Sequence, residues 1–420
     1  MLATLKKFMF ALSGSSIMQV ATLLCALIVA NMFGPVGLSK FGIVQNTITT
    51  IASVLPFGLG YTAINFINKN RHDGFGLAVA NFAFQICMIT SLLATLLLLV
   101  TSVPFSEQFF SDRSLYIFVI FAAVGLPFAA ISFIQYGLLN GYEAYRDIAK
   151  TGFISATATV AFVFAGTFVG GLYGAIAGFL LTLVIRAALL QHSLNRHCTI
   201  QYALPSRETW RKIKHFAIPA GLAGLSLTPS TWFANSLLIK YEGLEAQGVM
   251  MAALTVRMAI SFIPQQLSTV LLPQYIQSEG EPQRQHLLRM LRYAGLLTGS
   301  TLGLCAIAFI LREPLIGAFG DGFNADPVIF GLLLLSVTIE AMALPLSYFY
   351  ARREQMWRYL FTFTYPKDFT LVIASLILVP QQGAMGLALA YVIAIAVGFA
   401  LLGLTSFWSY VSNRSATVKA

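Results

Sequence analysis

The stretch "FGPVGLSKFG", residues 33–42, separates two long apolar segments, and the second segment starts almost at once. Glycine can close a helix end in the left-handed region, and proline cannot continue a preceding helix. The stretch therefore predicts a tight hairpin between two antiparallel helices, with Pro35 stopping the first. Because both flanks are strongly apolar, the two helices are expected to lie in lipid, with the hairpin as a short outer connector between them.

The composition supports a membrane protein. The chain has 420 residues, of which 57% are hydrophobic and only 10% are charged, whereas soluble domains carry about 25% charged residues. Runs such as "SLLATLLLLV" at 91–100 do not alternate polar and apolar residues, as the strands of a β-barrel would. Helices of about 20 apolar residues are the remaining way to cross the bilayer.

Apolar segments of that length recur along the whole chain. The segment after Lys6 and Lys7 is too long for a signal peptide and has no cleavage site, so it is interpreted as a retained span. Twelve transmembrane helices are predicted, at roughly 8–30, 41–67, 77–101, 115–139, 150–169, 172–191, 215–239, 247–275, 293–311, 327–350, 357–379 and 385–410.

Basic residues predict the orientation. If the N-terminus is cytoplasmic, only Lys40, Arg113, Lys240 and Arg312 fall in outer loops and three basic residues fall inside spans. The remaining 19 of the 26 basic residues then lie on the inner side. This asymmetry follows the positive-inside rule and places both termini in the cytoplasm. It also accounts for the net charge of +10 without any binding of nucleic acid.

An internal repeat relates the two halves of the chain. Gly37–Gly42 matches Gly243–Gly248 at an offset of 206 residues, and Gly171 matches Gly383 at an offset of 212. Because each half holds six spans, both halves enter from the same side of the membrane. The predicted fold is an all-α membrane protein with two six-helix lobes, 1–191 and 215–420, related by a pseudo-two-fold axis along the membrane normal. A basic cytoplasmic linker, 192–214, joins them.

Polar residues cluster in the first, second, seventh and eighth spans. Hydrogen bonding between packed helices is one interpretation. Their equivalent positions in both halves favour another, a polar cleft between the lobes. The candidate cavity residues are Gln19, Gln45, Asn46, Asn235 and Gln265.

Five charged residues fall inside predicted spans: Arg186, Arg257, Glu340, Lys367 and Asp368. A charge in the bilayer costs a few kcal/mol, so it should face a partner or water. Glu340 could form a structural pair with Lys367 or Arg257, and Arg186 could reach the inner surface. Lys367 and Asp368 are adjacent, so at least one is expected to find a partner elsewhere.

The functional interpretation makes the three cations part of a binding cavity. Arg257, Lys367 and Arg186 would offer positive charge to an anion such as a pyrophosphate. Glu340 or Asp368 would then serve as a proton-coupling site or a charge partner, because buried carboxylates hold protons more tightly.

Three motifs carry a resemblance to a known family. "ANMFGPVGLSKFGIVQ" at 30–45, "LLNGYEAYRDIA" at 138–149 and "GLYGAIAGFLLTLVIR" at 171–186 resemble the outer hairpin, an inner connector and the sixth span of Wzx-type O-antigen flippases. These belong to the multidrug/oligosaccharidyl-lipid/polysaccharide superfamily. The resemblance covers essentially the whole chain.

The resemblance implies a transporter and not an enzyme. It implies a flippase that carries undecaprenyl-pyrophosphate-linked oligosaccharide across the bacterial cytoplasmic (inner) membrane by alternating access through a cationic central cavity, with Arg257 as the best match. A polymerase and a chain-length regulator are the other partners to expect. The superfamily's multidrug antiporters favour an acidic residue in the early spans, and the first six predicted spans here contain none.

Two other functions remain open. A cation-coupled multidrug antiporter is one, and a membrane polysaccharide polymerase or ligase is the other, although the outer loops are short for such chemistry. No metal-ligand spacing and no P-loop appear, so neither a metal nor another cofactor is expected. The four cysteines are expected to form no disulfide.

Overall fold

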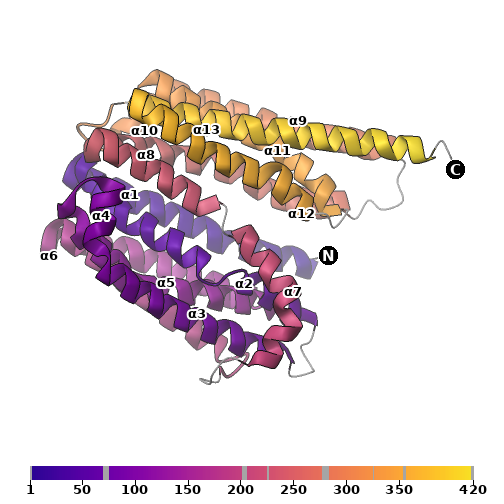
Figure 1. Cartoon of the computed structure of the whole chain (residues 1–420), viewed down its shortest axis with the longest axis horizontal. Helices are drawn as coiled ribbons and strands as arrows, with labels where there is room; N and C mark the ends of the chain where they lie inside the picture. Colours follow the sequence, from indigo (N-terminus) through magenta and orange to yellow (C-terminus); the bar gives the residue numbers. More distant parts are fainter. Residues whose placement is uncertain are drawn as a thin grey trace. The chain divides into compact units, whose positions relative to one another are not determined.

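The computed structural model describes residues 2–69, 75–200, 206–224, 227–276, 283–324, 326–352 and 356–417, and its regular elements are all helices (Figure 1). The α-helices are α1 (Leu2–Val54), α2 (Leu59–Lys69), α3 (Phe75–Val100), α4 (Ser102–Phe110), α5 (Tyr116–Gly141), α6 (Tyr145–Leu194), α7 (Arg207–Gly224), α8 (Leu227–Ile276), α9 (Gln283–Ile310), α10 (Arg312–Gly317), α11 (Pro327–Arg352), α12 (Met356–Tyr359) and α13 (Tyr365–Thr417). A 3-10 turn, η1 (Arg113–Leu115), and a π-helical turn, η2 (Leu360–Thr364), complete the described elements.

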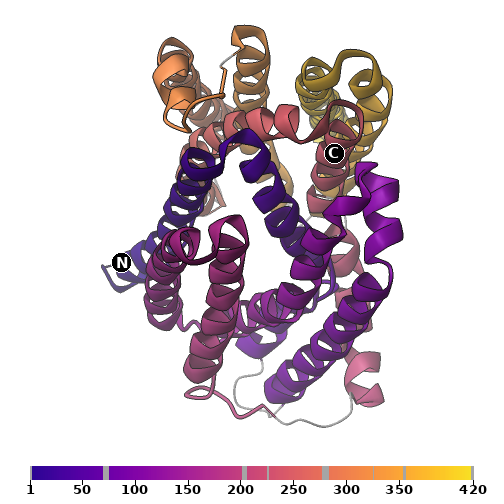
Figure 2. The same cartoon turned by 90° about the vertical axis from the view of Figure 1, so that its left-hand side faces the viewer.

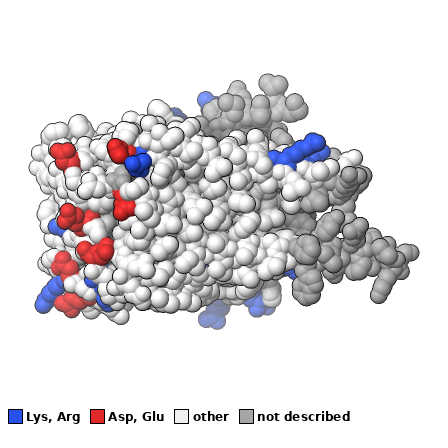
Figure 3. All heavy atoms as spheres, turned by 90° about the horizontal axis from the view of Figure 1, so that it is seen from above, with Lys and Arg blue, Asp and Glu red and all other residues white. Residues whose placement is uncertain are grey.

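Within these residues, eight helical stretches are long and apolar enough to cross a membrane. They are Ile17–Val54, Phe75–Val100, Arg113–Gly141, Tyr145–Leu194, Thr228–Ser268, Leu288–Ile310, Pro327–Tyr348 and Trp357–Ser406. The middle of the face drawn in Figure 3 shows no acidic or basic side chain, as a surface in contact with lipid requires. The prediction of an all-helical, multi-pass membrane protein is confirmed.

Four of the eight stretches are broken by a glycine in the left-handed region. Gly34, Gly171, Gly243 and Gly383 have φ values of 66°, 58°, 88° and 53°. Residues with a side chain rarely adopt such angles, so glycine is required at these points. The two arms of α1 and the apex between them are visible in Figure 2.

Contacts across α6 demonstrate that its two arms fold back on each other. A Cβ atom on Gly174 would fall on the carbonyl oxygen of Gly166, and one on Gly178 would fall on the carbonyl oxygen of Phe162. Residues 162 and 178 of a straight helix would be roughly 24 Å apart at 1.5 Å per residue. The stretch is therefore a helical hairpin, and its small residues allow the two backbones to touch.

The reversal points correct the predicted repeat register. The first-half equivalent of Gly243 is Gly34, not Gly37, because Gly34 and Gly243 are the residues with positive φ. Gly37 instead is a buried residue of the second arm, packed on Phe33. Pro35 opens that second arm, where its missing N–H group costs nothing, and the first arm is ended by Gly34.

The described residues form two compact units, Met1–Trp232 and Phe233–Ala420, here called unit 1 and unit 2. In unit 1, α1, α5 and α6 pack on one another, α3 packs on α5, and α2 lies against α3, α5 and α7. In unit 2, α11 packs between α9 and α13. The predicted lobes and linker, 1–191, 215–420 and 192–214, stay predictions, and residues 201–205 of that linker lie outside the described residues.

One contact joins two reversal points within unit 2. Glu242, next to Gly243 in α8, accepts a hydrogen bond from the Ala384 N–H group at 3.0 Å. Ala384 begins the second arm of α13, where backbone N–H groups have no intrahelical partner. The Glu242 carboxylate also occupies the space that a side chain at Gly383 would need. This contact fixes the hairpins of α8 and α13 side by side.

Candidate functional site

Arg257 is the centre of a polar network inside unit 2. Its Nε donates to Ser336 Oγ at 2.9 Å, and its NH2 group lies 3.2 Å from Glu340 Oε2. The guanidinium also lies over the Tyr391 ring, 5.2 Å from the centroid. Only 13% of the Arg257 side chain is exposed, so these three groups replace much of its water.

The network continues from Tyr391 to the first arm of α8. The Tyr391 side chain is hydrogen-bonded to Asn235, and Asn235 Oδ1 accepts from Gln247 Nε2 at 3.2 Å. Residues from both arms of α8, from α11 and from α13 are thereby joined. The hairpin at Gly243 makes this possible, because it folds Gln247 back beside Asn235.

This arrangement settles one of the alternatives for Glu340. The carboxylate pairs with Arg257 and not with Lys367. Ser336 and Tyr391 were missed as partners from the sequence alone. Ser336 could have been found, since it stands four residues before Glu340 and so shares its helix face. Tyr391 lies in another helix and gave no comparable signal.

Lys367 and Asp368 contact each other on α13. Lys367 Nζ lies 3.3 Å from Asp368 Oδ1, so the two adjacent residues pair with each other. Their Cβ atoms do diverge on the helix, but the long lysine side chain curls back to its neighbour. The Lys367 ammonium also lies 5.9 Å from the Phe363 ring centroid. Both side chains are largely buried, with 14% and 6% exposed.

Arg186 lies between two cavities inside unit 1. The cavities have volumes of about 170 and 230 Å³ and share Met18, Thr22 and Arg186 in their walls. The polar groups of the two walls are Gln19, Thr22, Gln45, Thr49, Ser132, Tyr136, Thr151, Thr159, Thr182 and Arg186. No carboxylate lines either cavity, and no described residue forms an ion pair with Arg186.

The remaining candidates divide into two groups. Gln19 and Gln45 line the cavities beside Arg186. Asn46 is half-buried outside the cavity walls, and Gln265 is exposed on α8. The hydroxyls of Thr22, Thr182 and Tyr136 were not identified from the sequence, because a threonine or tyrosine in an apolar helix looks the same whether it packs or lines a cavity.

The described residues offer no metal centre: no three histidine, cysteine or acidic side chains among them gather closely enough to hold an ion. The side chains of these sites are arginine, carboxylate, hydroxyl and amide groups, which offer charge and hydrogen bonds. Arg186 with its hydroxyl and amide neighbours can bind an anion. Arg257 can do so if Glu340 gives up its contact.

Comparison with known proteins identifies the family and the fold. Residues 4–279 match the family described as polysaccharide biosynthesis protein. Among curated proteins, no sequence matches this chain.

Solved structures match over almost the whole chain. The lipid II flippase MurJ in an inward closed conformation has a TM-score of 0.77 at 15% identity, covering 94% of this chain and 87% of that one. A MOP superfamily transporter from Pyrococcus furiosus, described by the reverse polarity of its binding pocket, has a TM-score of 0.68 at 18% identity, covering 96% and 95%. An outward-facing multidrug resistance transporter of the MATE family has a TM-score of 0.63 at 18% identity, covering 97% and 95%.

At these identities the structural likeness establishes the MOP superfamily fold, whose solved members named above are transporters and a flippase. The sequence match extends over more than half of the chain and is independent of that likeness. This chain therefore belongs to the polysaccharide biosynthesis protein family.

Proposed function

We propose that this protein is a flippase for undecaprenyl-pyrophosphate-linked oligosaccharide of the O-antigen type. It moves the glycan from the inner to the outer leaflet of the bacterial cytoplasmic membrane by alternating access. The proposal includes twelve membrane crossings, six in each half, because each of the four glycine-broken stretches counts twice. It also includes cytoplasmic termini and passage of the glycan on to a polymerase and a chain-length regulator.

The observation that carries the proposal is the setting of Arg186. A guanidinium surrounded by hydroxyl and amide groups, with no carboxylate in the cavity walls, attracts an anion and repels a cation. A pyrophosphate presents several acceptor oxygens, which suit the planar donors of arginine. The neighbouring Gln19, Gln45 and threonine hydroxyls supply the neutral donors and acceptors that sugars require.

Arg257 is proposed as the second cation, and Glu340 as its gate. In the resting state Glu340 holds Arg257. Protonation of Glu340 removes the competing charge, so that Arg257 can turn to the incoming pyrophosphate. Lys367 and Asp368 form a similar ion pair on α13. We propose the same roles for them, with Lys367 as the cation and Asp368 as its gate.

The test is transport by the purified protein in vesicles that contain a fluorescent undecaprenyl-pyrophosphate-linked oligosaccharide. Transport is read as the fraction of glycan that an added, membrane-impermeant glycosidase can reach. We expect Arg186→Gln to lower the initial rate at least tenfold. The matched control is Arg211→Gln, which removes an equal charge from an exposed position of helix α7. Equal rates for Arg186→Gln and the parent protein would reject the role of this cavity.

A cation-coupled multidrug antiporter is the alternative, because MATE transporters share the fold over nearly the whole chain. The cavity around Arg186 disfavours it, since cationic drugs need an anionic or neutral wall. Expression in a drug-sensitive host separates the two. Resistance to cationic drugs that requires Glu340 or Asp368 would favour the antiporter over the flippase.

A further inference from the structure

The helical hairpins of α6 and α13 pair their arms in the same register. In α6, the Cβ position of Gly174 falls on the carbonyl oxygen of Gly166. In α13, the Cβ position of Gly386 falls on the carbonyl oxygen of Leu378. Each residue of the second contact follows its counterpart in the first by 212 residues, and the two turn glycines are separated by the same number. Positions in the two hairpins can therefore be matched one to one.

Each hairpin carries a cation at the same distance from its turn, but on opposite arms. Arg186 lies 15 residues after the turn glycine of α6, and Lys367 lies 16 residues before the turn glycine of α13. At 1.5 Å per residue, each stands roughly 23 Å from its turn along the helix. The position that matches Arg186 in α13 is Gly398, and the position that matches Lys367 in α6 is Ser155.

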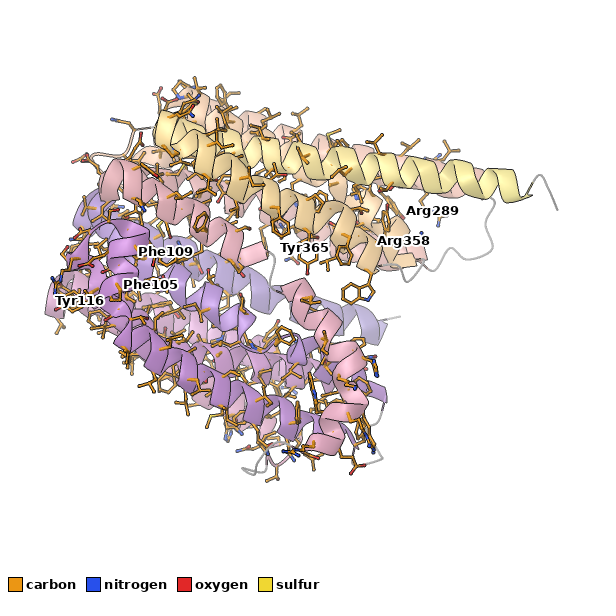
Figure 4. The ribbon with its side chains drawn as sticks, in the orientation of Figure 1. Phe105, Phe109, Tyr116, Arg289, Arg358 and Tyr365 are labelled. Carbon is orange, nitrogen blue, oxygen red and sulfur yellow. The ribbon has the colours of Figure 1, made fainter. Side chains whose placement is uncertain are left out.

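The two matched positions face each other across the hairpin, so only one of them can hold a long side chain. In α13, a side chain at Gly398 would begin only 3.1 Å from the Cβ atom of Lys367, which leaves it little room. Tyr365, two residues before Lys367, is labelled in Figure 4 and marks this level of the hairpin in unit 2. The shared register places Ser155 opposite Arg186 in α6. There the large and small residues have exchanged arms.

Ser155 has a buried hydroxyl that forms no hydrogen bond with the described residues. Only 1% of the residue is exposed. Other serines of these helices donate to a carbonyl oxygen one turn earlier, as Ser91 does to Met88 and Ser132 does to Phe128. A buried hydroxyl without a partner is costly, so its presence calls for a group that it can bind.

The cavities around Arg186 flank Ser155 on both sides. Thr151, about one helical turn before Ser155, lines the larger cavity, and Thr159, about one turn after it, lines the smaller. Residues four apart share a helix face, so Ser155 lies on the face that carries these two wall residues. A hydroxyl donor at this place suits an anion that Arg186 holds.

The neighbour of the cation differs between the two hairpins. Lys367 pairs with Asp368 at 3.3 Å, whereas the position that matches Asp368 in α6 is the buried residue Ala156. No carboxylate lines the cavities around Arg186 either. The α6 hairpin therefore keeps its full positive charge at this level, and the α13 hairpin is neutral there while Asp368 is ionised.

We propose that Ser155 and Arg186 form one phosphate-binding site in the α6 hairpin, and that α13 holds the equivalent site with its cation, Lys367, on the other arm. The guanidinium supplies the charge and the Ser155 hydroxyl supplies a further donor. Because the two arms face the same space, a cation on either arm serves the site. This inference rests on the proposed function and adds Ser155 and the equivalence of the two arms to it.

The first experiment moves the cation of α6 from one arm to the other. Arg186→Gly with Ser155→Lys reproduces in α6 the pair of residues found in α13. Binding of radiolabelled inorganic pyrophosphate to the purified full-length protein in detergent is measured by equilibrium dialysis. We expect Arg186→Gly alone to raise the half-saturating concentration about tenfold or more, because a charged hydrogen-bond donor is lost. The double variant should recover most of the affinity.

The matched control for the relocation is Arg186→Gly with Thr157→Lys. It adds the same charge two residues away, at an exposed position on another face of α6, and should not restore binding. Melting temperatures identify the variants that fold. Equal pyrophosphate affinity of the two folded double variants would overturn the equivalence of the two arms.

A second variant, Ser155→Ala, tests the hydroxyl without adding a charge. We expect several-fold weaker pyrophosphate binding at an unchanged melting temperature, because no hydrogen bond within the protein is lost. The matched control is Ser91→Ala, a buried serine of α3 whose hydroxyl donates to the Met88 carbonyl oxygen at 3.0 Å. It should melt at a lower temperature and keep its pyrophosphate affinity. Unchanged affinity of Ser155→Ala would remove Ser155 from the site, and this result stands even if the relocated variants do not fold.

Competition relates the site to a lipid-linked substrate. Displacement of the labelled pyrophosphate by farnesyl pyrophosphate, and not by farnesol, would show that the site binds the phosphate groups of a polyprenyl lipid. Displacement by unlabelled pyrophosphate alone would retain the anion site and assign it to free phosphates. Restored binding in the relocated variant without glycan transport by the parent protein would refute the flippase and retain the site. Glycan transport by the parent protein without any pyrophosphate binding would do the reverse.

Discussion

Arg257 is held by three different groups in unit 2, and one of them is a carboxylate. If Arg257 is changed to Leu, Glu340 keeps its charge but loses the partner at 3.2 Å. We expect this variant to lose about 1.5–3 kcal/mol of stability, the range for a hydrogen bond that involves a charged group. Thermal unfolding of the purified protein in detergent measures the loss.

The double variant Arg257→Leu with Glu340→Leu is the informative companion. Replacing a buried ion pair by apolar residues is often neutral for stability. We therefore expect its melting temperature to return close to that of the parent, while glycan transport stays abolished. Full transport by a stable double variant would mean that the pair is only structural, which is the interpretation that the sequence left open beside the functional one.

At the scale of single residues, the sequence predicted which side chains are unusual but not how they pair. Arg257 and Glu340 were recognised because charges in apolar helices are costly. The contact between Lys367 and Asp368 was not foreseen, because the direction of a Cβ atom does not limit a lysine side chain with four rotatable bonds. Partners in other helices, such as Tyr391, depend on packing that no local pattern encodes.

The helical hairpin of α6 is the element with the least room for change. A side chain at Gly174 would fall on the backbone of Gly166, whereas Gly170, at the turn, has no atom within 4 Å of its Cβ position. We expect Gly174→Ala to force the arms apart and cost about 1–3 kcal/mol, as overpacking does. Gly170→Ala is the matched control, and its φ of −142° suits any residue.

Melting temperatures of the two purified variants decide this prediction. A clear decrease for Gly174→Ala alone is expected, together with a lower yield in the membrane fraction. If both variants had the melting temperature of the parent protein, the two arms of α6 would be able to move apart without a loss of stability, which would contradict the prediction. The same reasoning applies to Gly386, whose Cβ would meet the carbonyl oxygen of Leu378 in α13.

At the scale of elements, hairpins were predictable and their exact register was not. Glycine next to a restart of apolar sequence indicated the reversals at residues 33–42 and near 171 and 383. The mistaken match of Gly37 with Gly243 arose because glycine is also common inside membrane helices, where it allows close packing. The dihedral angles at Gly34 and Gly243 distinguish the two uses of glycine. The π turn η2 had no sequence signal that we recognised.

For the molecule as a whole, composition was sufficient for the fold class. Too few charges to cover a soluble surface, and segments long enough to span lipid, led directly to a helical membrane protein. The family followed from motifs that are structural, which is why the substrate stays a proposal. Cavities such as those around Arg186 arise from the packing of several helices, so only the identity of a lining residue, and not the void, could be anticipated.

The orientation of the whole molecule can be tested at Cys198, which lies after α6 in the predicted cytoplasmic linker. The other three thiols are buried. We expect a membrane-impermeant maleimide to label Cys198 in inside-out membrane vesicles and not in intact cells. Glu245→Cys, placed beside the predicted outer turn of α8 in a background without native thiols, should show the opposite pattern. Labelling of Cys198 from outside would reverse the predicted orientation.

The pH dependence of the same reaction tests the local structure of the linker. Burial raises the pKa of the Cys198 thiol, while its hydrogen bond with Tyr142 lowers it by a smaller amount. Maleimide reacts with the thiolate, so at neutral pH Cys198 should react more slowly than an exposed cysteine such as Glu245→Cys. Its rate should keep rising at pH values where the rate at the exposed site has levelled off. Tyr142→Phe removes the hydrogen bond that stabilises the thiolate, so the rate profile should shift to still higher pH. An unshifted profile would show that Tyr142 does not contact the Cys198 thiol in the membrane-bound protein.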